Sequence, residues 1–134
     1  MSIQKVIVLT SEDRTLDDAC KKIQRIPKVR FAGVLDKMGK KIAGGFKEGL
    51  SSYLEDKQNQ MMYVQLTLEY LMRRDFDDKL GAIDYIASRR GKVTMISIPT
   101  KEYLILISAQ RDIDVEEIIR EVNSAFTTLP DVPP

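Results

Sequence analysis

The chain holds few side chains that could carry out chemistry. It has no histidine and a single cysteine, Cys20, among its 134 residues. The absence of histidine excludes a Ser-His-Asp triad, a histidine general base and a histidine-containing zinc site. Cys20 lies at helical spacing with Leu16 and Ile23, so we interpret it as a small buried core residue rather than a nucleophile or redox thiol. A single cysteine also cannot form an internal disulfide.

Carboxylates occur as sequence neighbours rather than as a catalytic pair. Three such pairs are Asp17-Asp18, Asp77-Asp78 and Glu116-Glu117. Adjacent residues on a helix point about 100° apart, so none of these pairs is arranged for general acid–base catalysis. The middle pair and the nearby Asp75 do not follow the spacing of a calcium loop, and a solvated helix face explains them better than a weak cation site. We therefore predict no metal site.

Two glycine-containing segments resemble nucleotide-binding loops only in composition. In residues 33–41 a lysine follows Gly39, but the spacing is one residue too long and no Ser or Thr follows the lysine. Gly44, Gly45 and Gly49 lack the dinucleotide-binding spacing. We predict no cofactor and no catalytic residue, so the chain is not expected to be an enzyme.

The balance of charge argues against a nucleic acid as the main partner. The chain has 21 Lys+Arg and 20 Asp+Glu, which gives a formal net charge of +1. Basic residues do gather locally, and solvated loops are the favoured interpretation, with a nucleic-acid surface as the weaker alternative. These local groups are Lys37, Lys40, Lys41 and Lys47; Arg73 and Arg74; and Arg89, Arg90 and Lys92.

Composition indicates a soluble domain. Hydrophobic residues make up 43% of the chain and charged residues 31%, as is usual for a globular protein. The apolar run at residues 6–9 is too short for a signal peptide or a membrane span, so we expect a cytoplasmic protein. We predict one domain over residues 1–126. Residues 127–134 contain three prolines and are expected to form an extended tail.

The hydrophobic pattern predicts an ordered series of helices and strands. A short strand is expected first, and a helix then begins with Thr15 as its N-cap and Asp17 and Asp18 in its first turn. Asp114 is predicted to cap the last helix, with Glu117 three residues later. The turn at residues 36–39 ends in Gly39, which favours a hairpin, and Gly44-Gly45 suggest a bulge or a close backbone approach. The expected strands are 3–9, 29–35, 40–46, 83–88, 93–98 and 103–107; the expected helices are 15–26, 61–80 and 115–126.

Two of these elements make demands on their surroundings. Residues 103–107 are apolar at every position, and a strand without alternation must be covered on both faces of its sheet. The helix over residues 61–80 is apolar on more than one face, so it must contact more than one surface. One stripe consists of Met61, Val64, Leu68, Leu71 and Met72, while Met62, Leu66 and Tyr70 lie off it.

The order helix, hairpin, long helix, three-stranded meander, helix resembles the roadblock/LC7 family, which belongs with the longin and profilin-like α/β/α architectures. The segments that carry the resemblance are the hairpin at residues 31–43, the meander at residues 83–109 and the final helix. Residues 30–109 also resemble uncharacterised archaeal proteins. The fold class implied is α/β (α+β), with a central five-stranded antiparallel sheet and helices on both faces. The strand at residues 3–9 departs from the family, which opens on the helix.

The resemblance implies a non-catalytic homodimer or heterodimer, joined through the long helix and the first meander strand. Family members bind small GTPases or scaffold signalling complexes. Physical chemistry supports the same surface, because a polar edge strand beside a helix with two apolar faces needs a partner. The predicted interface residues are Met61, Met62, Leu66, Tyr70, Arg73, Asp84, Ile86 and Ser88.

The predicted function is therefore a dimerising adaptor or regulator that acts with a small GTPase or a scaffold protein. The alternative is a profilin- or PAS-like sensor that holds a small molecule between the sheet and the long helix. A cavity beneath that helix distinguishes the two, because a filled core there counts against the sensor.

Overall fold

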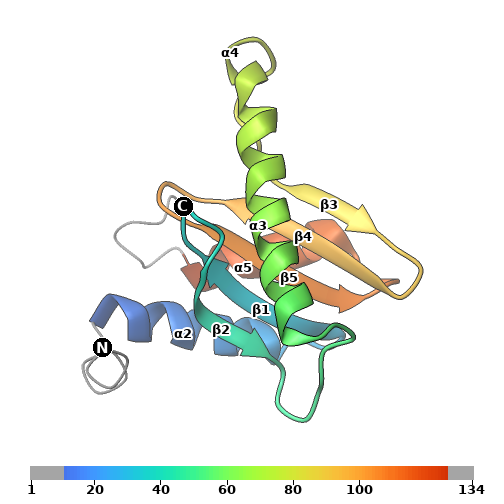
Figure 1. The fold of residues 1–134 in the computed structure, drawn as a ribbon. Helices are drawn as coiled ribbons and strands as arrows, with labels where there is room; N and C mark the ends of the chain where they lie inside the picture. The colour runs from blue at the N-terminus through green and yellow to red at the C-terminus, as the bar shows by residue number, and fades with distance from the viewer. Residues whose placement is uncertain (1–10, 127–134) are drawn as a thin grey trace.

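The computed structural model describes residues 11–126, arranged as a five-stranded antiparallel sheet between helical layers (Figure 1). The predicted strand over residues 3–9 and the tail over residues 127–134 lie outside the described residues. The helices are α2 (Ser11–Gln24), α3 (Asp56–Arg73), the 3-10 turn η1 (Arg74–Phe76), α4 (Asp77–Leu80) and α5 (Val115–Phe126). The strands are β1 (Val29–Leu35), β2 (Lys41–Phe46), β3 (Ile86–Arg89), β4 (Val93–Pro99) and β5 (Leu104–Gln110).

The strand order is β2-β1-β5-β4-β3, so β5 lies at the centre of the sheet. Ile107 of β5 is paired with Ala32 of β1 on one side and with Ile96 of β4 on the other. The side chains of β5 alternate between two separate apolar clusters, one on each face of the sheet. This confirms the predicted fold class and the expectation that the apolar strand is covered on both faces.

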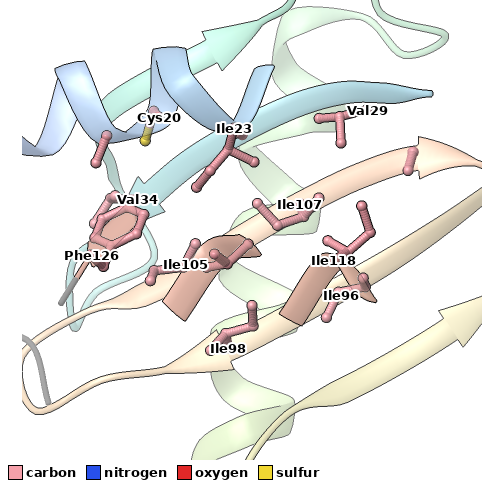
Figure 2. Close-up of a cluster of buried hydrophobic side chains, with 14 of the residues drawn as sticks. Cys20, Ile23, Val29, Val34, Ile96, Ile98, Ile105, Ile107, Ile118 and Phe126 are labelled. Atoms are coloured by element: carbon pink, nitrogen blue, oxygen red, sulfur yellow. The ribbon is translucent and has the colours of Figure 1, made fainter. Parts of the chain in front are cut away.

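One face of the sheet, which we call the closed face, is covered by α2 and α5 (Figure 2). Ile105 and Ile107 of β5 point to this side, where Cys20 of α2 and Val122 of α5 are fully buried. Burying an aliphatic or aromatic side chain of this size contributes about 1.5–3 kcal/mol. The closed face is therefore the main source of stability of the domain.

The opposite face, which we call the open face, is covered by α3 alone (Figure 1). Leu104 and Leu106 of β5 point to this side and form a smaller cluster with Phe31, Leu35 and Tyr63. The ring centroids of Phe31 and Tyr63 lie 6.0 Å apart, so an aromatic contact ties the first half of α3 to β1.

The β1–β2 hairpin forms as predicted. An oxygen of the Asp36 carboxylate accepts hydrogen bonds from the backbone N–H groups of Met38 and Lys40, at 2.9 and 3.0 Å. Gly39 has φ +82°, a conformation that glycine adopts without strain. A Cβ at this position would lie 2.8 Å from the Cα of Val64, so the turn also packs directly under α3.

Gly44 confirms the predicted close approach of backbones. It has φ +81°, and a Cβ there would lie 2.2 Å from the carbonyl oxygen of Ala32 and 2.9 Å from the Sγ of Cys20. Its N–H donates to the carboxylate of Asp17 at 3.0 Å, which joins α2 to β2. The bulge lies elsewhere, opposite the register shift between Val34 and Leu35, where Ile42 is the extra residue.

The predicted starts of two helices were wrong. The pattern assigned residues 11–14 to a connection and made Thr15 the N-cap, but α2 includes these residues, so Thr15 and Asp17 lie within the helix rather than at its start. The long helix begins at Asp56 rather than Met61, because Glu55 and Gln58 form a capping box.

The predicted end of α3 and the start of β3 also need correction. The helix predicted over residues 61–80 is interrupted by the 3-10 turn, although the chain continues in nearly the same direction. The strand predicted over residues 83–88 begins at Ile86. Tyr85 explains the shift, because its hydroxyl donates to the carboxylate of Glu116 and its ring packs against the closed-face cluster. The predicted cap of α5 is confirmed, since the N–H of Glu117 donates to Asp114 at 3.3 Å.

Candidate functional site

The outward side of α3 carries exposed apolar side chains along its whole length. We call these residues the outer stripe. They are Met61, Val64, Leu68, Leu71 and Met72, and their exposed fractions run from 41% to 70%. Because α3 lies on the sheet as a single layer, nothing in the described part of the chain covers this side. The stripe predicted from the sequence is therefore present, and it is uncovered in the described part of the chain.

Other predicted interface residues lie on the sheet side of α3. Met62, Leu66 and Tyr70 are half-buried and pack against the open-face cluster, while Met61 belongs to the outer stripe. The helix thus divides the predicted set between its two sides. Whether these residues form an interface remains a prediction.

The remaining predicted residues lie near the β3 edge. Within residues 11–126, β3 is paired with β4 on one side and is the last strand of the sheet on the other. Ile86 and Ser88 are paired with Ser97 and Met95, and Met95 packs against the open-face cluster. Asp84 precedes the strand, contrary to the predicted range. Arg73, at the end of α3, is ion-paired with Glu69 at 3.4 Å.

Beyond Arg73 the chain continues past the β3 edge of the sheet (Figure 1). We call residues 74–80 the acidic segment, because its three aspartates, Asp75, Asp77 and Asp78, outnumber its two cations, Arg74 and Lys79, and leave a formal charge of −1. Its two large apolar side chains are among the most exposed of the described residues, with Phe76 at 62% and Leu80 at 82%. Two large apolar side chains are thus exposed within one short segment.

A groove of about 560 Å³ lies between the first half of α3 and the open face of the sheet. We call it the basic groove. Its apolar residues include Phe31, Met62, Met95 and Leu106. The small-molecule alternative requires a space between helix and sheet, and this groove provides one.

Three cationic side chains line the basic groove: Arg30, Arg90 and Lys92. The Arg30 guanidinium lies 4.4 Å from the ring centroid of Tyr53, and the Lys92 ammonium lies 5.5 Å from it. Arg30 also donates to the backbone oxygen of Ser51 at 3.1 Å. Among the described residues, no aspartate or glutamate lines the groove. Its electrostatic character therefore favours an anionic group.

Cys20 is a core residue, as the sequence indicated. Its side chain is fully buried, and burial, followed by the negative charge of Asp17, raises the pKa of the thiol to about 12. A thiol with this pKa is not ionised near neutral pH and is a poor nucleophile.

The hairpin lysines do not form a free cationic patch. Lys37 is ion-paired with Glu102 at 3.2 Å, Lys41 donates to the backbone oxygen of Gly44, and Lys47 donates to that of Ile26. These contacts support the solvated-loop interpretation. Within residues 11–126, no group of three or more histidine, cysteine or acidic residues could hold a metal ion. None of the described helices is both long enough and apolar enough to cross a membrane.

Sequence reasoning missed the basic groove and the acidic segment as sites. The sequence shows the basic cluster Arg89, Arg90 and Lys92, but no local pattern connects it to Arg30 or Tyr53.

Comparison with protein families decides the family of this fold. A model described as a family of unknown function (DUF6659) matches residues 10–127. The chain belongs to the DUF6659 family. Comparison of this DUF6659 chain with curated proteins gives no match.

Solved structures similar to the DUF6659 chain confirm the resemblance to roadblock/LC7 domains. A roadblock/LC7 domain from Streptomyces avermitilis is 13% identical, with a TM-score of 0.63 over 87% of this chain and 92% of its own. The gliding protein MglB from Thermus thermophilus is 9% identical, with a TM-score of 0.75 over 91% and 90%. An MglB described as having a tetrameric arrangement is also 9% identical, with a TM-score of 0.76 over the same shares. At these identities the likeness establishes the fold.

Proposed function

We propose that this DUF6659 chain is a non-catalytic, dimerising protein-interaction module that acts as an adaptor or regulator in the cytoplasm. The observation that carries the proposal is the combination of the β3 edge with the exposed outer stripe of α3, whose end lies near that edge (Figure 1). Each feature alone occurs in monomers. Together, in the described part of the chain, they supply unpaired backbone groups and an uncovered apolar surface, and a second copy can satisfy both.

In the proposed dimer, the β3 strands of two copies pair antiparallel and the two α3 helices lie antiparallel beside each other. Pairing at β3 satisfies the backbone groups of both edges and makes one continuous sheet. The two helices then contact each other along the edge of the outer stripe that borders the partner helix. Leu68 and Leu71, which are 52% and 41% exposed in the single chain, are proposed to lie in this contact. The tetrameric arrangement described for one structurally similar MglB supports self-association in this fold.

We further propose that the paired helices bind a small GTPase or a scaffold protein. The roadblock/LC7 resemblance supports this class of partner, and the arrangement of residues supports a binding role over a catalytic one. The thiol of Cys20 is buried and not ionised, and the groove contains cations but no carboxylate among the described residues.

The dimer is tested by sedimentation equilibrium of the full chain from low to high micromolar concentration. The wild type is expected to sediment as a dimer. Leu68→Glu is expected to weaken self-association at least tenfold, because it puts two buried charges into the symmetric interface. The matched control is Asn123→Glu, which adds the same charge at an exposed position of α5 on the other side of the sheet and is expected to leave the dimer intact. A monomeric wild type at high micromolar concentration would contradict the proposal.

The partner is tested by calorimetric titration of the wild type and the same two variants with the small GTPase encoded nearest to this chain's gene. The GTPase is loaded with GDP or with a non-hydrolysable GTP analogue. Binding that Leu68→Glu loses and Asn123→Glu keeps supports a role for the paired helices. No binding in either nucleotide state removes this GTPase as the partner and leaves the dimer test unaffected.

A further inference from the structure

We propose that the basic groove of one copy receives the acidic segment, residues 74–80, of a second copy. The inference rests on the proposed dimer and adds a second, charged contact to it. Each protomer supplies one groove and one segment, so a two-fold dimer contains the contact twice.

Charge complementarity identifies the occupant. The groove is lined by Arg30, Arg90 and Lys92 without an acidic residue among those described. The segment has three aspartates against Arg74 and Lys79, which gives it a formal charge of −1. Within residues 11–126, neither the groove cations nor these aspartates form an ion pair. The ion pairs among the described residues are Lys21–Asp17, Lys28–Asp112, Lys37–Glu102 and Arg73–Glu69.

Apolar complementarity points to the same pair of surfaces. Phe76 ends the 3-10 turn and Leu80 is the last residue of α4. Their side chains are 62% and 82% exposed, and no described residue covers them. The groove offers Met95 and Leu106 as apolar lining. An aromatic side chain that enters such a groove while its acidic neighbours meet a basic rim is the usual arrangement of an interface anchor.

The reach of the segment fits a dimer that pairs at β3. At 1.5 Å per residue, the seven residues after Arg73 extend about 10 Å beyond the end of α3, which is about two strand spacings of 4.8 Å. The end of α3 lies near the β3 edge (Figure 1), so the segment of one copy would lie over β3 and β4 of the other. The groove contains Val93 and Met95 of β4.

The antiparallel direction of the two helices also fits. The groove lies beside the first half of α3, where Gln58, Met62 and Gln65 line it. In an antiparallel pair, the end of one helix lies beside the start of the other. The segment cannot reach the groove of its own chain, because it begins nine residues after Gln65 and is therefore about 14 Å further along the same rod.

The test exchanges the signs of the two surfaces in the full chain. The segment variant is Asp75→Lys with Asp78→Lys, and the groove variant is Arg90→Glu with Lys92→Glu; all four residues are exposed. In each homodimer both contacts become repulsive, and the dimer dissociation constant at low salt is expected to rise about tenfold or more. An equimolar mixture of the two variants is expected to recover wild-type affinity as a heterodimer, because every groove then meets a segment of opposite sign.

The matched control for the groove variant is Lys101→Glu with Arg120→Glu, which makes the same change of charge at exposed positions away from the groove. It is expected to keep the wild-type dissociation constant. A further variant, Phe76→Ser, is expected to weaken the dimer about tenfold without loss of helical circular dichroism, since the side chain is exposed in the single chain.

The outcomes separate this inference from the proposed function. A wild type that stays monomeric overturns both. A wild-type dimer whose affinity is unchanged in the segment and groove variants overturns the docking alone. Weakened homodimers that the mixture does not restore also overturn the docking. Recovery on mixing supports it, because an intrachain contact would be repaired only when both exchanges are made in one chain.

Discussion

The two faces of the sheet share the strand β5 but are covered in different ways. On the closed face, two helices bury every large side chain that β5 and α5 direct inwards, including Ile107 and Val122. On the open face, a single helix covers a small cluster and leaves a groove beside Leu106. The closed face therefore accounts for the stability of the single chain, and the open face provides surface for association. One strand contributes to both faces because its successive side chains point alternately to the closed face and the open face.

The largest expected difference comes from two neighbouring residues of β5, each truncated to alanine. Ile107→Ala on the closed face is expected to lower the free energy of unfolding by about 4 kcal/mol, because the packed surroundings cannot collapse around the cavity. Leu106→Ala is expected to cost about 2 kcal/mol, since it borders a groove that water and flexible side chains can fill. Both are measured by urea unfolding in the Leu68→Glu background, so that dimer formation does not contribute. Equal costs would contradict the division between the faces.

Alanine substitutions at Gly44 and Gly49 test how tightly α2 packs against β2 on the closed face. Gly44→Ala is expected to destabilise the chain by about 2–4 kcal/mol, because φ is +81° and the new Cβ would lie 2.2 Å from the Ala32 oxygen. Gly49→Ala is the control, with φ +85° and no atom within 4 Å of the new Cβ, and about 1 kcal/mol is expected there. Thermal or urea unfolding measures both. If Gly44→Ala lowers the free energy of unfolding no more than Gly49→Ala does, the packing between α2 and β2 is looser than the short distances at Gly44 indicate.

The smallest effect is expected at the exposed end of the closed face, where Lys28 is ion-paired with Asp112 at 2.9 Å. The hydrogen bond and positive charge of Lys28 hold the pKa of the Asp112 carboxyl below its usual value of 3.8. A lowered folded-state pKa means that the contribution is present above the unfolded-state pKa and is lost as the pH falls through the folded-state pKa. The stability advantage of the wild type over Asp112→Asn should therefore be small at pH 7 and disappear in acid. Unfolding curves from pH 7 to pH 2 measure it, and an advantage that grows in acid would reverse the sign.

The sequence predicted the sheet well because the strands carry their own signals. The apolar run at residues 103–107 required cover on both sides, and alternating residues of β5 do face two clusters. Gly39 marked the hairpin because only a positive φ closes that turn beneath α3. Such features depend on residues that are close together in the sequence, so they could be predicted before the fold was known.

Boundaries and the site were harder to predict because distant residues decide them. The start of β3 moved to Ile86 because Tyr85 bonds to Glu116, which lies 31 positions further along the chain. The basic groove brings together Arg30, Tyr53 and Lys92, and no sequence pattern joins those positions. The predicted interface named the edge strand and the long helix, but it placed Met62, Leu66 and Tyr70 on the partner side although they pack towards the sheet.

The pairing of β1 with β5 has a consequence for how the chain folds. Sixty-eight residues separate Leu35 from Leu104, the two residues that meet at one end of this ladder. The β1–β2 hairpin and the β3–β4–β5 meander can form from local contacts, whereas joining them requires closure of that long loop. At a synthesis rate of about 5–20 residues per second, β1 waits roughly 3–14 s for its central neighbour. During this interval one edge of β1 is unpaired, so a nascent chain is most prone to misassociation after its first hairpin and before β5 emerges.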